Sequence, residues 1–458
     1  MKYFMRHFLQ LFGFGLLLLT THSCSKLIEV GSPKNQLTTD KVFADSLSAI
    51  SALGNIYFKL ANNLNSNYNK QLSLYTDEFS FTATDEEFYN GQISPNNGTN
   101  SNIWNYFYEI IYSCNDILEK LDLTNSLKPR MKSQMINEAK FVRAFCYYHL
   151  FILYEHIPLI IETNVDKNRI ALQADSTEVF TLIVSDLIEV KKELPIEYPS
   201  SDRTRANKWS ASALLAQVYL YQQRWQEALD EADAILSSGL YTPISEINEV
   251  FLASSKETIL QLWRKDGFIS DATILIPSSN TVVPRYLIAE SLHALFEKDD
   301  LRQSNWLGVN NVEMDGVSQA YTFPYKYKNR SGSHSAPEYL KVLRASEQYL
   351  IRAEAKAHLG DISGAILDLN IIRKRAGVPE EEASLEKQTC LELIYRERQI
   401  ELFNEWAKRF IDLKRTGKLN TVMTTHKVSW KNGVSERLPI PFSELIYNPN
   451  LIQNEGYY

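Results

Sequence analysis

The chain has 458 residues, of which 44% are apolar and 22% are charged, and these proportions are typical of a soluble globular protein. Its length suits one large domain or two to three ordinary ones. The net charge of -7, without a basic stripe, argues against nucleic acid as a partner.

The first residues have the pattern of a secretory signal. Lys2 and Arg6 precede an apolar run, 8–19, which is shorter than the ~20 residues that a membrane-spanning helix needs. The leader ends in "LLLLTTHSCSK", so Cys24 is either the last residue of the discarded leader or the first of the mature chain. The richest later apolar run, 149–161, is interrupted by charged residues and proline. We therefore expect an exported protein that is itself soluble.

The other three cysteines are Cys114, Cys146 and Cys390. They are scattered, they show no metal-type spacing, and their number is odd if Cys24 has another use. Each lies in an apolar, helix-like context, so we expect buried free thiols.

Helical periodicity dominates the first half of the mature chain. Residues 102–121 place Trp104, Phe107 and Ile111 along one helical face. A second amphipathic helix is predicted over 134–154, ending before Pro158. A third, over 176–195, begins with acidic residues and ends with lysines, as the charges at the two ends of a helix favour.

Two later segments share a spacing of small residues. In 207–239 two short helices are predicted, broken near residues 223–224, with Ala228 placed 12 residues after Ala216. In 347–377 Ala353 and Ala365 are again 12 apart, with a break at Gly360. Alanines at these places let antiparallel helices approach closely, as in tetratricopeptide units. A third match to the first helix of such a unit lies at 143–148.

Two long stretches read as irregular. Residues 62–102 are polar and aromatic, and residues 240–340 are rich in Pro, Ser, Asn and Gly with a few short predicted strands. Long loops on a rigid frame are where binding surfaces usually form. Flat rings stack on sugar faces, so the candidate ligand contacts are the loop aromatics together with one acidic residue. They are Asp77, Phe79, Phe81, Tyr89, Trp263, Trp306, Tyr321 and Tyr325.

A search for catalytic and metal motifs yields little. There is no phosphate loop, no nucleophile elbow and no zinc-binding helix motif, so we expect no cofactor and no metal. The acidic pair Asp77–Glu78 keeps an exported polysaccharide-degrading enzyme as the alternative, since glycosidases use two carboxyl groups. The charged segment 390–419 repeats acidic and basic residues at helical spacing, which favours a structural ion-pair network.

The residues resemble a known family. "IWNYFYEIIYSCNDIL", "EAKFVRAFCYYHLFILYEHIPLI", "ANKWSASALLAQVYLYQQRWQEALDEADAIL", "YLIRAEAKAHLGDISGAILDLNIIRKRAG", "YRERQIELFNEWAKRFIDLKRTG" and "LPIPFSELIYNPNLIQNEGYY" occur in this order. Together they resemble the SusD/RagB family of outer-membrane nutrient-binding lipoproteins of Bacteroidetes. The loops match no particular member, so no substrate carries over.

The resemblance implies a mostly α-helical fold built on tetratricopeptide-like helix pairs, with long irregular loops and a few short strands. It implies a signal peptide over 1–23, an N-terminal helical region over 24–240 and a C-terminal region over 241–458 in one globule. It also implies that Cys24 is lipidated and holds the protein on the outer membrane, facing the cell exterior. The expected role is non-enzymatic capture of a glycan or peptide for a SusC-like TonB-dependent transporter.

Overall fold

The computed structural model describes residues 45–62, 65–82, 86–243, 246–332 and 336–457. The predicted signal peptide and Cys24 lie outside these residues. Within them, no helix combines the length and the apolar character that crossing a membrane requires.

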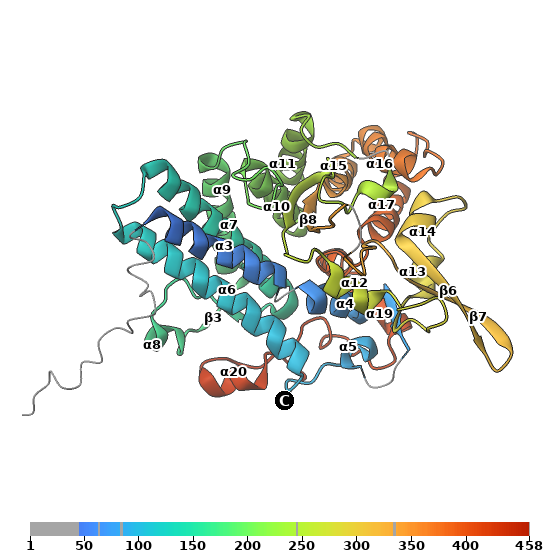
Figure 1. Cartoon of the computed structure of the whole chain (residues 1–458), viewed down its shortest axis with the longest axis horizontal. Coiled ribbons are helices and arrows are strands. Elements are labelled where there is room, and N and C mark those ends of the chain that lie inside the picture. The colour runs from blue at the N-terminus through green and yellow to red at the C-terminus, as the bar shows by residue number, and fades with distance from the viewer. Residues whose placement is uncertain (1–44, 63–64, 83–85, 244–245, 333–335, 458) are drawn as a thin grey trace, which may run out of the picture.

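A continuous array of helices forms the frame of the molecule (Figure 1). Each helix packs on the next, and α3 covers the first two. The array comprises α3 (Ser46–Asn62), α6 (Gly98–Leu123), α7 (Pro129–Tyr154), α9 (Ser176–Glu193), α10 (Lys208–Tyr221), α11 (Trp225–Ser237), α15 (Ala345–Leu359), α16 (Ile362–Ala376) and α17 (Lys387–Leu402). The prediction of a mostly α-helical fold with paired helices is confirmed.

The small residues that predicted the helix pairs lie where the helices touch. Ala216 and Ala228 are fully buried between α10 and α11, and Ala353 and Ala365 are fully buried between α15 and α16. The predicted breaks are also present, because Gly360 adopts a left-handed conformation with φ of 94° between α15 and α16. Helix α9 begins with a capping box from Asp175, one residue before the predicted start.

The first stretch expected to be irregular contains a buried helix instead. Residues 65–75 form α4 (Asn65–Tyr75), followed by β1 (Phe79–Phe81) and α5 (Glu87–Asn90). Tyr68 packs edge-on against Phe107 of α6, with ring centroids 5.7 Å apart, and Tyr75 is also fully buried. Polar residues hide the helical pattern of α4 in the sequence, while its aromatic residues supply the burial.

The second stretch holds short elements, as expected, and one longer hairpin. The elements are η2 (Ile247–Glu249), β4 (Thr258–Leu262), α12 (Ile269–Leu275), β5 (Tyr286–Ile288), α13 (Glu290–His293), α14 (Leu301–Trp306), β6 (Leu307–Met314), β7 (Val317–Pro324) and β8 (Leu340–Arg344). The hairpin β6–β7 pairs eight residues on each strand and projects from the globule (Figure 1). Antiparallel pairs also join β1 to β5, β4 to β8, and β2 (Ile157–Pro158) to β3 (Gln173–Ala174).

The charged segment 390–419 is not one helix. After α17 the chain turns through residues 403–407, where Asn404, Trp406 and Ala407 all have positive φ, and α18 (Lys408–Arg415) and α19 (Leu419–His426) follow. The indole nitrogen of Trp406 donates to the carbonyl oxygen of Lys341 at 2.7 Å. This buried anchor fixes the turn. The remaining helices are α8 (Val165–Asn168) and α20 (Phe442–Tyr447).

The expected ion-pair network is present and buried. Glu401 of α17 pairs with Arg302, Arg344 and Arg375, which come from α14, β8 and α16. Arg344 also reaches Glu257, with Nη1 and Oε1 2.6 Å apart. Each buried charge has opposite charges beside it, so the network joins α14, β8, α16, α17 and the segment of Glu257 in one arrangement.

The core is continuous from the N-terminal to the C-terminal region. One cluster of buried apolar side chains runs from Ala49 to Leu451 and takes residues from both halves of the chain. The thiols Cys114, Cys146 and Cys390 are free and buried, as predicted.

Candidate functional site

Two of the predicted ligand contacts belong to the core. Phe79 is 1% exposed, because β1 pairs with β5 and places Phe79 opposite Ile288. Trp306 is 0% exposed, and its indole nitrogen donates to the carbonyl oxygen of Ile247 at 3.2 Å. Neither ring presents a face to a ligand, so the prediction is wrong for these two residues.

Asp77 is also engaged inside the protein. Both of its carboxylate oxygens accept hydrogen bonds from Arg409, each at 2.7 Å, and Gln399 donates to one of them at 3.3 Å. Burial opposes ionisation of Asp77, but the hydrogen bonds and charge of Arg409 hold its pKa below the usual value. Because the carboxylate is buried and paired, the prediction of a ligand contact is wrong for Asp77.

The neighbouring Glu78 is buried beneath the same region. Its Oε2 accepts from Ser73 Oγ at 2.7 Å and from the backbone nitrogen of Asn404 at 3.4 Å. Its Oε1 has no hydrogen-bond partner in the described part of the chain. Burial raises the pKa of Glu78 to about 7, although the hydrogen bond from Ser73 opposes this rise.

Two further aromatics are half-buried at separate places. Tyr89 lies on α5, with the ammonium of Lys427 4.6 Å from its ring centroid. Tyr321 lies on β7, and its hydroxyl donates to the side-chain oxygen of Gln319 at 3.0 Å. The prediction that they contact a ligand stays a prediction.

Three predicted aromatics gather around α12. Phe81 packs on Tyr286 of β5 with centroids 5.2 Å apart, and Tyr286 in turn lies beside α4, which contacts α12. Trp263 is 48% exposed and precedes Arg264, whose guanidinium pairs with Asp271 of α12. Tyr325 packs against a small apolar cluster of Ala272 from α12, Ile276 just after it and Phe323 of β7.

Charged and amide groups surround this aromatic group. The Lys70 ammonium lies 5.7 Å from the Tyr286 ring centroid, and the Arg285 guanidinium lies 5.2 Å from the Phe81 ring centroid. Lys70 and Asp271 line a hollow between α4 and α12 whose volume, ≈ 10 Å³, has room for about one water molecule. Recognition here would take place on the surface. We call this region, made by Lys70, Phe81, Trp263, Asp271, Arg285, Tyr286 and Tyr325, the α12 surface.

The charged residues of the α12 surface were not predicted from the sequence. Lys70 lies on the unrecognised helix α4, and Asp271 lies on a seven-residue helix. Arg285 directly precedes the three-residue strand β5, in which Tyr286 pairs with Phe81 of β1, 205 residues earlier in the chain. The short apolar run "RYLI" at 285–288 was the only local signal of a strand.

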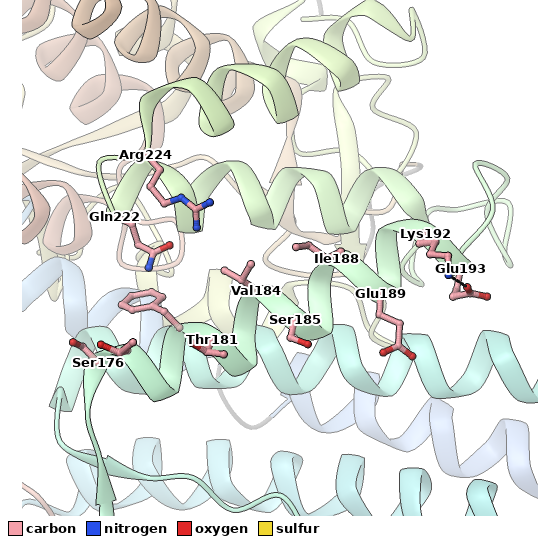
Figure 2. A pocket seen from close by; sticks show the side chains of 12 residues that line it. Ser176, Thr181, Val184, Ser185, Ile188, Glu189, Lys192, Glu193, Gln222 and Arg224 are labelled. Atoms are coloured by element: carbon pink, nitrogen blue, oxygen red, sulfur yellow. Dashed lines mark ion pairs between the residues drawn. The ribbon is translucent and has the colours of Figure 1, made fainter.

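A wider hollow lies elsewhere, along α9 (Figure 2). It has a volume of ≈ 890 Å³ and is lined mainly by hydroxyls, charged groups and the aliphatic side chains of Val184 and Ile188. Gln222 and Arg224 lie at one end, and Lys192 and Glu193 lie at the other (Figure 2). Its one ring, Phe180, is 7% exposed, so this groove offers little aromatic surface for stacking.

No group of three or more His, Cys, Asp or Glu side chains suited to holding a metal ion occurs among the described residues. The α12 surface offers three means of binding a ligand: aromatic stacking, hydrogen bonding and charge.

Two family descriptions match the sequence. The SusD family matches residues 309–457, and a group described as "Starch-binding associating with outer membrane" matches residues 27–220. A SusD-like protein of Formosa agariphila is 26% identical over 78% of this chain and 80% of its own length. Starch-binding protein SusD of Bacteroides thetaiotaomicron is 23% identical over 74% of this chain and 75% of its own.

Solved structures show the same fold. A SusD superfamily protein from Bacteroides vulgatus superposes with a TM-score of 0.79 at 21% identity, covering 90% of this chain and 99% of that one. A structure described as a laminarin-binding SusD-like protein has a TM-score of 0.76 at 25% identity, covering 90% of this chain and all of that one. With both parts of the sequence and the whole fold in agreement, the chain belongs to the SusD/RagB family.

Proposed function

We propose that this protein binds a glycan nutrient at the cell surface and delivers it to a SusC-like TonB-dependent transporter in the outer membrane. The observation that carries the proposal is a set of partly exposed rings linked to α12. Tyr325 packs on the cluster that includes Ala272 of this helix, Trp263 precedes Arg264, which pairs with Asp271, and Phe81 packs on Tyr286 beside α4. Aromatic faces edged by polar groups match the apolar faces and hydroxyl rims of sugars. The laminarin-binding and starch-binding relatives support a glycan ligand.

We propose that the protein binds the glycan without cleaving it. Asp77 and Glu78, the acidic pair on which an enzymatic alternative would depend, are 4% and 3% exposed. Asp77 is held by Arg409, and burial accounts for the raised pKa of Glu78. Neither carboxyl group faces solvent across a cleft as a glycosidase pair must. This arrangement supports a binding protein over a polysaccharide-degrading enzyme.

The anchor in the proposal is Cys24, which lies outside the described residues. We propose that the leader is cleaved after Ser23 and that the new N-terminal cysteine is lipidated, with the polar stretch 25–37 as a tether to the globule. Several acyl chains give stable attachment where one gives only marginal binding. Mass spectrometry of the mature N-terminus tests this proposal, and an unmodified start beyond Cys24 would overturn it.

The ligand proposal is tested by titrating the purified protein with neutral and acidic oligosaccharides and with peptides, while chromatography monitors product formation. We expect calorimetric binding of at least one glycan, no product, and a loss of affinity of about tenfold or more in Phe81→Ala. Tyr447→Ala is the matched control, because Tyr447 is 73% exposed on the distant helix α20. Turnover of a bound glycan, or binding of peptides alone, would contradict the proposal.

A further inference from the structure

We propose that the α12 surface takes an acidic oligosaccharide, in which a sugar carries a carboxylate or a sulfate group. The inference rests on the proposed function, since it names the class of glycan that the same surface binds. It comes from the balance of charged and polar groups around Arg285.

Arg285 is an exposed cation held in place by aromatic rings. Its guanidinium carbon lies 5.2 Å from the Phe81 ring centroid and 5.9 Å from that of Tyr286. Its backbone oxygen accepts from Thr82 N at 3.2 Å, so strand pairing fixes the residue. No described residue forms an ion pair or hydrogen bond with its side chain. The guanidinium is therefore positioned by the rings, and its N–H donors remain available to an incoming anion.

A second cation lies beside it. The Lys70 ammonium is 5.7 Å from the same Tyr286 ring centroid and lines the hollow between α4 and α12. Burial lowers the pKa of Lys70, and the nearby charge of Arg285 lowers it further, although Asp271 and Glu86 act in the opposite direction. An anion placed between Lys70 and Arg285 would relieve the repulsion of these two cations.

The uncharged groups at the hollow are also donors. Asn69 and Asn404 line it, and their side-chain oxygens already accept from Trp406 N at 2.9 Å and from Ser73 Oγ at 3.4 Å. Their amide nitrogens donate to no described residue. Both residues are less than a tenth exposed, so these donors can reach a ligand only through a water molecule in the hollow.

The charge balance of the surface differs from that of the chain. Near α12 and its rings the described cations include Lys70, Arg264, Arg285, Lys328 and Arg330, and the described carboxylates include Glu86, Asp271 and Glu338, of which Asp271 is paired with Arg264. The whole chain carries a net charge of -7. A local excess of cations on an acidic protein attracts anionic ligands to that place.

A carboxylate or sulfate oxygen pair can accept two parallel hydrogen bonds from the Arg285 guanidinium while the sugar ring rests against the exposed part of Phe81. A neutral glycan can use the ring but leaves the guanidinium in water. Because a charge-assisted hydrogen bond contributes roughly 1.5 kcal/mol or more, we expect acidic ligands to bind about tenfold more tightly.

The test is calorimetric titration of the purified protein with three oligosaccharides: galacturonate oligomers, sulfated galactan oligomers and neutral laminarin oligomers. The first two separate carboxylate from sulfate as the recognised group. We expect at least one to bind about tenfold more tightly than laminarin, and this preference to fall at about 0.5 M salt. Arg285→Gln should abolish the preference, measured as the ratio of the affinity for the acidic oligomer to the affinity for laminarin in the same variant. Arg130→Gln, at an exposed site on α7, is the matched control.

Equal affinity for acidic and neutral oligomers, or an unchanged preference in Arg285→Gln, would overturn the inference. If laminarin binding is lost in Phe81→Ala but no acidic preference exists, the inference fails and the proposed function stands. If none of the three oligomers binds, the proposed function fails with it.

Discussion

Replacing Glu78 with glutamine should stabilise the protein at about pH 8 and leave its stability near pH 4 almost unchanged. Glu78 is 3% exposed beneath β1, and its Oε1 has no hydrogen-bond partner among the described residues. Glutamine has the same shape, stays uncharged at every pH, and keeps an oxygen that can accept from Ser73 Oγ and Asn404 N.

The magnitude follows from the raised pKa. Burial raises the pKa of Glu78 from 4.5 to about 7, so between these values the folded protein keeps a proton that the unfolded chain has released. The free energy of unfolding therefore falls as pH rises through this window, and the contribution is fully present below pH 4.5. The gap between the two pKa values corresponds to about 3 kcal/mol. Glu78→Gln should recover most of it above pH 7.

Urea unfolding followed by tryptophan fluorescence, at steps between about pH 4 and pH 8, measures this difference. The quantity to compare is the free energy of unfolding of the variant minus that of the wild type. In this difference the contributions of the other titrating groups to the pH dependence cancel. Glu382→Gln, at an exposed site, is the control and should show no such pH dependence. Parallel pH profiles for wild type and Glu78→Gln would refute the assignment of a buried protonated carboxyl group.

The remaining predictions concern packing and a second buried titratable group. Gly308→Ala should lower the free energy of unfolding by about 1–3 kcal/mol, because the added methyl group overlaps the Phe323 ring across the β6–β7 hairpin; an unchanged denaturation midpoint would contradict this. His149 is fully buried, and its Nδ1 lies 2.7 Å from the Tyr68 hydroxyl. Burial and then the charge of Lys408 hold the pKa of His149 well below its ordinary 6.5. Stability is therefore lost as pH falls below 6.5, by up to about 1.4 kcal/mol per pH unit, relative to His149→Gln. Thermal unfolding of both proteins at about pH 7.5 and pH 5.5 checks this, and equal losses would contradict it.

The helical frame could be predicted because its signals are local. Ala216 and Ala228 mark one helix contact, and Ala353 and Ala365 mark another, since only small residues let two helices approach so closely. The two alanines of each set lie in neighbouring helices of one pair, so their spacing along the sequence indicates how the two helices pack. Helix α9 begins at Ser176, as predicted, and ends at Glu193, two residues before the predicted end.

The binding surface could not be predicted because its neighbours are distant in the sequence. Phe79 and Phe81 alternate on one short strand, and only the pairing of β1 with β5 decides that Phe79 is buried while Phe81 stays partly exposed. The same pairing brings Arg285 to Phe81. Trp306 was a loop residue in the sequence, but the η2 backbone and the Lys326 ammonium enclose it.

Hydrogen–deuterium exchange of the protein with and without a bound oligosaccharide tests the central claim most directly, because it locates the ligand. We predict slower exchange over residues 79–82, 268–276 and 284–288, in β1, β5 and α12, and at Trp263 and Tyr325, the other rings of the α12 surface. Protection along α9 and residues 222–224, the groove of Figure 2, would contradict the assignment of the α12 surface as the site of glycan capture.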